Sequence, residues 1–359
     1  MIHNLESVKT VPTYYISEID FGRILDKLIT RADVYAPKKE EENHFYSKIT
    51  PENKAQIQYG GPRAVIPIKS FFFAPREGVG EYFNDGETFE PASPKAIIGV
   101  SACDLKALKG LDEVFMNGDI KDPFYVDARE KNLVISTDCK SCWPSCFCNI
   151  IGYDPYPEDG FDLNVSKIQG GFLIDVGSKK GESLYQEFRF FFREATPEEL
   201  SQKERDRNSA KRQVAESNSR FKFKNPLYRI VRETLQFDAW RDITRDCVEC
   251  GACNFSCPTC TCFLLYDKRK DVINERIKIW DACLKAQYAR VAGGANPRPK
   301  IFERLNNRYQ CKFDYMHERH NMYTCVGCGR CIDACMAKID MREALTRLEA
   351  DLALSAKLE

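Results

Sequence analysis

The chain has 359 residues, of which 43% are hydrophobic, so it is long enough for two or three domains with buried cores. Its 53 basic and 53 acidic residues cancel, which excludes a global electric field that would attract nucleic acid or an anionic membrane. No apolar stretch reaches the roughly 18 residues that a membrane-spanning helix needs.

The amino-terminal segment 1–15 (MIHNLESVKTVPTYY) lacks both the charged and the apolar region of a signal peptide. The 17 cysteines are an odd number and many follow CxxCxxC spacing, which favours metal binding in a reducing cytoplasm over disulfides in a secreted protein. The chain has few histidines from which a histidine-rich metal site could be built. The four are His3, His44, His317 and His320.

Helix and strand signals alternate through the first half of the chain. A first amphipathic helix is predicted from apolar residues at helical spacing: Phe21, Ile24, Leu25, Leu28 and Ile29. Residues 62–68 (PRAVIPI) predict a strand around Val65–Ile68, followed by the aromatic run Phe71–Phe73 that is typical of buried packing.

A βαβ unit is predicted next. Residues 95–101 (KAIIGVS) and 132–137 (NLVIST) are apolar stretches typical of buried parallel strands, and a helical stripe from Leu105 to Phe115 lies between them. Parallel neighbours end at the same edge of a sheet, where ligand sites of open α/β sheets lie. Cys103 and Cys139 follow the two strand ends, so we expect them to lie close together.

Cys139 opens a dense cysteine run, 139–148 (CKSCWPSCFC), that predicts an iron–sulfur cluster in the first domain. The four cysteines of this run could suffice, but the spacing of Cys146 and Cys148 places them on opposite faces of a strand unless the backbone kinks. The preferred ligand set is therefore Cys103, Cys139, Cys146 and Cys148, with Cys142 as the substitute. Structural zinc or free buried thiols are the alternatives.

Gly170–Gly171 predicts a hairpin whose second strand is 171–176 (GFLIDV). No GxGxxG follows a strand and no GxxxxGK[ST] occurs, so we expect neither flavin nor nucleotide on this chain. Electrons must then enter and leave through other subunits.

Residues 196–224 carry many charges of both signs and few large apolar residues, which predicts a solvated helix or a mobile connector, with a basic docking patch as the alternative. A helical stripe from Leu227 to Leu235 then leads into the second cysteine-rich region. The predicted organisation is an α/β domain at 1–195, a charged linker at 196–225 and a second domain at 226–359.

Two near-identical runs in the second domain have the spacing of a two-cluster ferredoxin, in which the fourth cysteine of each run binds the other cluster. One [4Fe–4S] cluster is thus assigned to Cys247, Cys250, Cys253 and Cys335. The other is assigned to Cys325, Cys328, Cys331 and Cys257. Zinc is the alternative, but zinc sites normally use cysteine pairs. We expect Arg330 and Lys338 to tune the second cluster.

The long insertion 258–324 between the runs carries four more thiols: Cys260, Cys262, Cys283 and Cys311. These could hold a fourth cluster or could simply pack beside the other clusters. Residues 280–283 (WDAC) are expected on a helix, and His317 and His320 are expected to be solvated or hydrogen-bonded rather than ligands. Met336 replaces the usual proline after the last cysteine, and an amphipathic helix is expected to follow it.

The predicted fold is an α/β domain with a βαβ unit, followed by a mainly α-helical, ferredoxin-like domain with two [4Fe–4S] clusters and a long insertion. A set of motifs then resembles a known family: PIKSFFFAPRE (67–77), GVSACDL (99–105), Cys146-Phe-Cys148, CPTCTCF (257–263), WDAC (280–283), AGG (292–294) and CVGCGRC (325–331). The chain resembles the iron–sulfur subunit family that serves anaerobic sulfite reductase and includes the beta subunit of [NiFe] sulfhydrogenase. Cys142 and Cys311 depart from that pattern.

The resemblance implies an electron relay in a cytoplasmic heteromeric complex of anaerobic metabolism. It implies a flavoprotein partner that binds FAD and oxidises NAD(P)H, and a terminal catalytic subunit of the sirohaem, NiFe or heterodisulfide-reductase type. One alternative is a self-contained small-molecule reductase with an open iron in the first-domain cluster. A zinc-stabilised binding module is the other.

Overall fold

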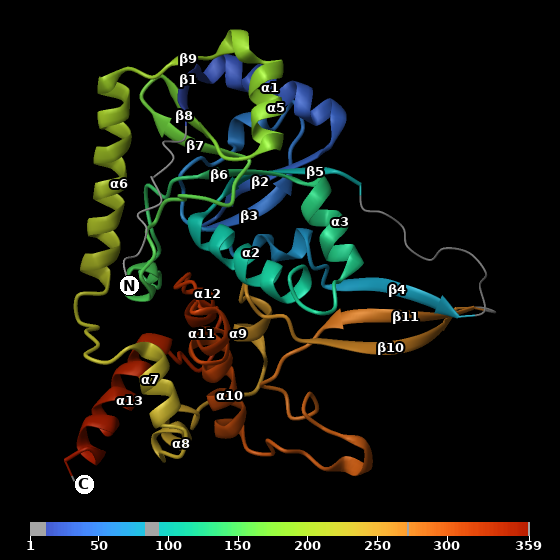
Figure 1. The fold of residues 1–359 in the computed structure, drawn as a ribbon, viewed down its shortest axis with the longest axis vertical. Helices are drawn as coiled ribbons and strands as arrows, with labels where there is room; N and C mark the ends of the chain where they lie inside the picture. Colours follow the sequence, from blue (N-terminus) through green and yellow to red (C-terminus); the bar gives the residue numbers. More distant parts are fainter. Residues whose placement is uncertain (1–11, 83–92, 271–272, 358–359) are drawn as a thin grey trace, which may run out of the picture.

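The computed structural model describes residues 12–82, 93–270 and 273–357, and Figure 1 shows a sheet-based upper half above a largely helical lower half. The chain therefore has the mixed α/β character that the sequence predicts. Most of the segment without signal-peptide features, and His3 with it, lie outside the described residues.

The upper half is built on an eight-stranded mixed sheet of order β3-β2-β5-β6-β7-β8-β1-β9. The central strands β2, β5, β6 and β7 are parallel, and the remaining pairs are antiparallel. The bounds are β1 Thr13–Ser17, β2 Asp33–Glu40, β3 Asn43–Lys48, β5 Lys95–Val100, β6 Leu133–Thr137, β7 Leu163–Ile168, β8 Gly171–Val176 and β9 Arg193–Glu194.

Helices cover both faces of this sheet (Figure 1). On one face lie α1 Glu18–Arg31 and α5 Lys179–Glu187, and on the other lie α2 Ala102–Phe115 and α3 Pro123–Lys131. Each face buries its own apolar core, because the central strands are apolar on both sides. The predicted first helix, the parallel βαβ pair β5–β6 and the hairpin β7–β8 are confirmed.

The strand predicted around Val65–Ile68 is wrong. The segment bends and then forms the 3-10 helix η2, Ile68–Phe71, which starts after Pro67. Proline lacks the N–H that a strand ladder needs, and Pro67 lies within the predicted strand. Three further 3-10 turns are described: η1 Lys54–Gln56, η3 Arg189–Phe191 and η4 Ala292–Gly294.

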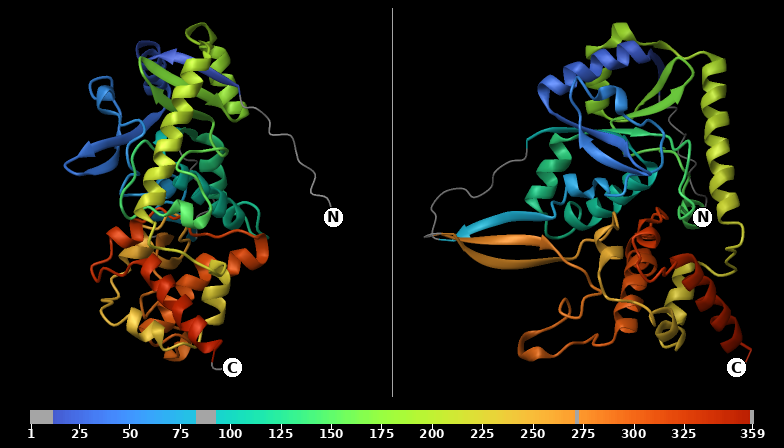
Figure 2. Two further views of the ribbon diagram at one scale, coloured as in Figure 1. Left: turned by 90° about the vertical axis from the view of Figure 1, so that its left-hand side faces the viewer. Right: turned by 180° about the vertical axis from the view of Figure 1, so that it is seen from behind.

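The charged segment after the sheet forms one regular helix, α6 Pro197–Ser217, that runs along the side of the upper half (Figure 2). Thr196 and Glu199 form a capping box at its start. Lys203 on its inner face donates to the Asp175 carboxylate of β8 at 2.6 and 2.7 Å. This helix is therefore exposed to solvent on its outer face and anchored to the sheet by a buried ion pair on its inner face.

The lower half packs short helices around one core that includes the fully buried Trp240. Its helices are α7 Leu227–Glu233, α8 Ala239–Ile243, α9 Ala252–Phe255, α10 Ile301–Phe313, α11 Tyr315–His320, α12 Arg330–Asp333 and α13 Met341–Ser355. The expected carboxy-terminal amphipathic helix is α13, whose apolar face packs on α7 and α8.

The insertion between the two cysteine runs contains a β-hairpin, β10 Phe263–Lys270 and β11 Ile273–Trp280. Strand β4, Arg76–Tyr82, comes from the first half of the chain and pairs with β11, completing a three-stranded sheet that projects from the body (Figure 2). The helix predicted for 280–283 is wrong, because Trp280 ends β11 and Cys283 lies in the turn that follows.

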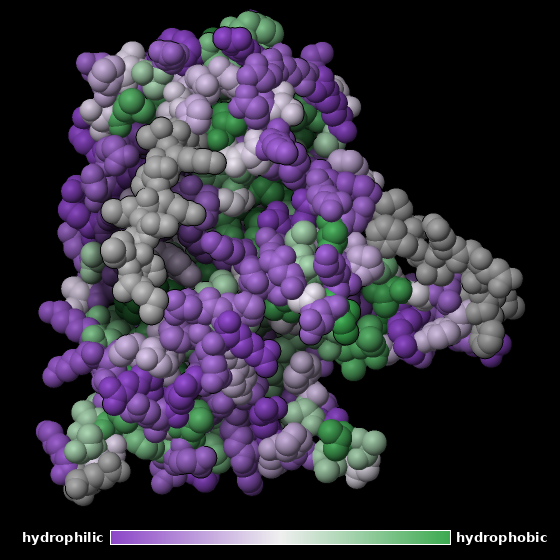
Figure 3. All heavy atoms as spheres, in the orientation of Figure 1, coloured by the Kyte–Doolittle hydropathy of each residue, from purple (hydrophilic) through white to green (hydrophobic). Residues whose placement is uncertain are grey.

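The outer surface is polar on most of the face in Figure 3, with apolar patches beside the projecting sheet. In the part of the chain that the structure describes, no helix combines the length and the apolar character that crossing a bilayer requires.

Candidate metal centres

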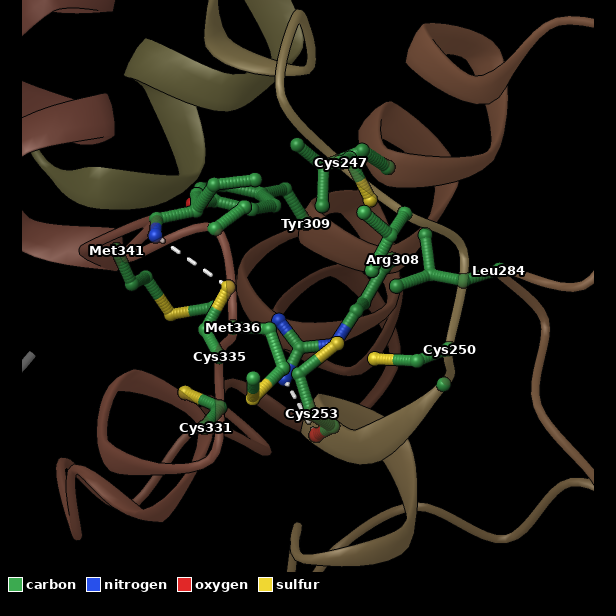
Figure 4. Close-up of a pocket in the computed structure, with 15 residues that line it drawn as sticks. Cys247, Cys250, Cys253, Leu284, Arg308, Tyr309, Cys331, Cys335, Met336 and Met341 are labelled. Atoms are coloured by element: carbon green, nitrogen blue, oxygen red, sulfur yellow. Dashed lines mark hydrogen bonds between the residues drawn. The ribbon is translucent and has the colours of Figure 1, made fainter.

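Three hollows in the structure are lined by cysteines, and together they contain thirteen of the 17 cysteines of the chain. The outer hollow is lined by Cys247, Cys250, Cys253, Cys331 and Cys335 (Figure 4). The middle hollow is lined by Cys257, Cys325, Cys328 and Cys331. The first-domain hollow is lined by Cys103, Cys139, Cys142, Cys146, Cys148 and Cys328.

The two ferredoxin-like runs build the outer and middle hollows by the same local geometry. In each run the glycine after the second cysteine, Gly251 or Gly329, has a positive φ of 74° or 72° and starts a short helix. This conformation suits glycine, and it turns the chain so that three thiols face one space. Cys335 of the second run lines the outer hollow with the first run, and Cys257 of the first run lines the middle hollow with the second run.

The first-domain hollow lies at the carboxyl ends of β5 and β6. Cys103 is in the first turn of α2, and its sulfur lies 3.2 Å from Ser101 Oγ. Cys146 and Cys148 face the same space because the backbone turns between them and helix α4, Cys148–Ile151, begins there. Cys103 and Cys139, which follow the ends of two neighbouring strands, therefore line the same hollow, as the sequence predicts. All five thiols line the hollow, so the choice between Cys103 and Cys142 stays open.

The first-domain hollow is closed by residues of the second cysteine run. The N–H of Phe147 donates to the Gly327 carbonyl at 2.7 Å, and Arg63 Nε donates to the Cys328 carbonyl. Gly327 has a φ of 64°, and an added Cβ would lie 2.5 Å from the Cys148 Cα. The two halves of the chain thus meet backbone to backbone at this point.

Burial in these hollows favours the neutral form of the cysteine side chains. Burial raises the pKa of the Cys103, Cys139 and Cys325 thiols well above the usual range, and that of Cys331 to about 12. Thiolates are the form that ligates iron, so a cluster bound here would have to supply the positive charge that stabilises them. Buried thiols spaced around a hollow are the donor set that a [4Fe–4S] cubane uses, with one thiolate for each iron.

A single metal ion fits less well. Among the residues that the structure describes, no three His, Cys, Asp or Glu side chains converge closely enough to hold one ion. A mononuclear zinc site needs four ligands about 2.0–2.3 Å from one point, whereas cubane ligands are spread over the corners of a cluster.

Of the four thiols of the insertion, three lie near one another and the fourth, Cys311, is on a different element. Cys262 is hydrogen-bonded to Cys283, which together with Tyr288 lowers the pKa of Cys262 to about 6 against the effect of burial. Asn254 Nδ2 lies 3.2 Å from the Cys283 sulfur and 3.8 Å from that of Cys260. Cys311 is half-buried on α10, on a different element from the other three thiols.

The three histidines within the described residues line none of the three hollows. His317 stacks on Tyr228 with ring centroids 4.1 Å apart. His320 Nδ1 lies 3.6 Å from a Glu113 carboxylate oxygen, and buried His44 lies beside Trp143.

The sequence reasoning missed the buried cations around the hollows. Arg308 lines both the outer and the middle hollow, and Lys312 lines the middle one. Both are on α10, where i and i+4 residues share a face, but a charged pair on a helix ordinarily indicates a solvated surface. Arg330, which we expect from the sequence to tune the second cluster, is instead paired with buried Asp104 at 2.8 Å, and Lys338 is exposed.

Comparison with known proteins agrees with this geometry. Residues 246–339 match the family model described as a 4Fe-4S dicluster domain, which supports two [4Fe–4S] clusters in the lower half. The chain is 29% identical over 337 residues to Sulfhydrogenase 2 subunit beta of Pyrococcus furiosus, covering 92% of this chain and 97% of that protein. The predicted resemblance is therefore confirmed: this chain contains a 4Fe-4S dicluster domain and is similar over most of its length to a sulfhydrogenase beta subunit.

Proposed function

We propose that this chain is the electron-relay subunit of a cytoplasmic heteromeric redox complex. It would pass electrons between a flavoprotein that binds FAD and oxidises NAD(P)H and a terminal catalytic subunit. The observation that carries the proposal is that the three hollows lie in series. Cys328 lines both the first-domain and middle hollows, and Cys331 lines both the middle and outer hollows.

Cysteines at the two ends of the series are more exposed than those at its centre, as a relay between two partners requires. The middle hollow has buried Cys257, Cys325 and Cys328. The outer hollow reaches the surface at the exposed Cys250, beside Met336, which is 77% exposed. The first-domain hollow contains Cys139, Cys142 and Cys103, all half-buried.

The proposed ligand sets follow the crossed arrangement. Cys247, Cys250, Cys253 and Cys335 would hold the outer cluster, and Cys325, Cys328, Cys331 and Cys257 the middle one. Cys103, Cys139, Cys146 and Cys148 would hold a third cluster. When bound, such clusters take up and release one electron at a time. A fourth cluster at Cys260, Cys262, Cys283 and Cys311 stays a prediction.

The terminal subunit would be of the sirohaem, NiFe or heterodisulfide-reductase type. Similarity to a sulfhydrogenase beta subunit favours the NiFe type. Anaerobic purification with identification of the co-eluting subunits by mass tests this choice directly, because each type brings a different catalytic subunit.

Counting iron tests the first-domain site. Anaerobically purified wild-type chain should hold roughly twelve irons, and Cys103→Ser should lose about four of them. Cys142→Ser is the matched control, since this thiol lines the same hollow and should be dispensable. If the iron content is unchanged in Cys103→Ser but falls in Cys142→Ser, then Cys142 is the ligand and Cys103 is the dispensable thiol. Iron-free protein would overturn the relay.

A turnover assay separates the relay from a self-contained reductase. The purified chain, supplied with reduced viologen and sulfite, should show no turnover if the chemistry takes place in a partner subunit. Steady turnover that disappears in Cys103→Ser would instead place an active site at the first-domain hollow.

A further inference from the structure

Arg308 lies between the two clusters proposed for the lower half. Its side chain is 3% exposed and lines both the outer and the middle hollow. Nη2 donates to the Cys253 carbonyl at 3.1 Å, while the buried Nε has no hydrogen-bond partner within the described structure. Figure 4 shows the guanidinium extending among Cys253, Cys335 and Met336.

A buried guanidinium with an unused donor needs an anion nearby. An arginine stays charged in proteins, and burying an unpaired charge or donor is costly. Burial opposes the charge on Arg308, but the sulfurs of Cys253, Cys331, Cys260 and Cys257, as thiolates, raise the pKa of Arg308 above its usual range. A cubane with four thiolate ligands is an anion, and its sulfurs accept hydrogen bonds that influence its reduction potential.

We infer that Arg308 is the shared counter-charge and hydrogen-bond donor of the outer and middle clusters, and that it raises both reduction potentials. This inference rests on the proposed function, because it takes the two crossed ligand sets as given. A positive charge favours the reduced cluster, which carries one more negative charge than the oxidised one.

Lys312 makes the two sites unequal. It lies one helical turn after Arg308, is 2% exposed, and lines the middle hollow but not the outer one. Nζ donates to Thr259 Oγ1 at 2.9 Å and to the Thr259 carbonyl at 3.2 Å. The middle site therefore has two buried cations where the outer site has one, and the middle cluster should be reduced first.

The first-domain hollow has no comparable excess of charge among its described residues. Its cation is Arg63, whose guanidinium is paired with the Asp333 carboxylate and donates to the Cys328 carbonyl. Arg330 and Asp104, close to Cys103, neutralise each other. The centre of the series would thus be the strongest electron acceptor of the three.

Arg304 provides a matched control on the same helix. It is also buried, but it is paired with Glu249 at 2.7 Å and donates to the Leu284 carbonyl at 2.9 Å. It lines neither hollow. Arg304→Met should therefore disturb the packing but leave the reduction potentials of both clusters unchanged.

The experiment is a redox titration followed by electron paramagnetic resonance on anaerobic full-length protein, with iron counted in every sample. Arg308→Met should lower the reduction equilibrium constant of both dicluster centres at least tenfold, about 59 mV for one electron. Lys312→Met should lower only the higher of the two potentials. Arg308→Lys should keep most of the wild-type values, and Arg304→Met should leave both in place.

Unchanged potentials in Arg308→Met with full iron would overturn the inference and leave the relay intact. If Arg308→Met does not retain iron, Lys312→Met carries the test, and an unchanged titration of that variant overturns the inference. Wild-type protein that lacks the two dicluster signals would instead refute the proposed function itself.

Discussion

Asp104→Asn removes the negative partner of the buried ion pair that joins the two halves of the chain. Asp104 is 0% exposed and Arg330 2% exposed, and the pair is bidentate with both N–O distances at 2.8 Å. Arg330 Nε also donates to the Ala64 carbonyl at 2.9 Å. The asparagine would leave a buried guanidinium without its counter-charge, close to the thiols of Cys103 and Cys328.

Breaking one partner of a buried pair costs about 3–5 kcal/mol of folding free energy. We expect a loss in this range for Asp104→Asn, measured by anaerobic urea unfolding and followed by tryptophan fluorescence. The double variant Asp104→Leu with Arg330→Met should recover most of the loss, because it removes both charges. The control is Asp159→Asn, which breaks a surface pair with Lys106 and should cost about 0–1 kcal/mol. A loss below about 1 kcal/mol for Asp104→Asn would refute the reasoning.

Three more outcomes are expected. Gly327→Ala should cost at least about 1–2 kcal/mol and release iron from the first-domain hollow, because its φ is 64° and the new Cβ would meet Cys148; full iron and wild-type stability would contradict this. Lys203→Met should cost about 3 kcal/mol in urea unfolding, because buried Asp175 would keep only an arginine at 3.7 Å as a cationic partner; Lys167→Met, on the exposed side, is its control. Burial lowers the pKa of His44 below 6.5, so the unfolded chain binds a proton at this histidine more tightly than the folded chain does. The free energy of unfolding should therefore fall as the pH drops through 6.5. His44→Gln should reduce that loss, and a pH profile identical to that of the wild type would count against the explanation.

Much of the candidate site could be predicted because it depends on local and regular geometry. Parallel neighbouring strands end at one edge, so Cys103 and Cys139 could be placed together from strand positions alone. The repeated run with a glycine after its second cysteine likewise predicts a loop that turns three thiols inward. The crossing of Cys257 and Cys335 follows from the same repeat.

The remaining features depend on contacts between distant parts of the chain. Nothing local to Arg308 indicates burial, because its position is decided by the hollows that α10 meets after folding. The pairing of β4 with β11 could not be predicted either, since the partners lie far apart in the sequence and strand patterns carry no information about which edge they join. The turn between Cys146 and Cys148 could not be predicted from the sequence, because the spacing of these two cysteines is typical of a strand.

The strand pair β4–β11 also bears on how the protein is made. Residues 76–82 leave the ribosome well before residues 273–280. At synthesis rates of roughly 5–20 residues per second, β4 waits on the order of 10–40 s for its partner strand. During that interval the nascent chain carries an unpaired edge and reactive thiols at once.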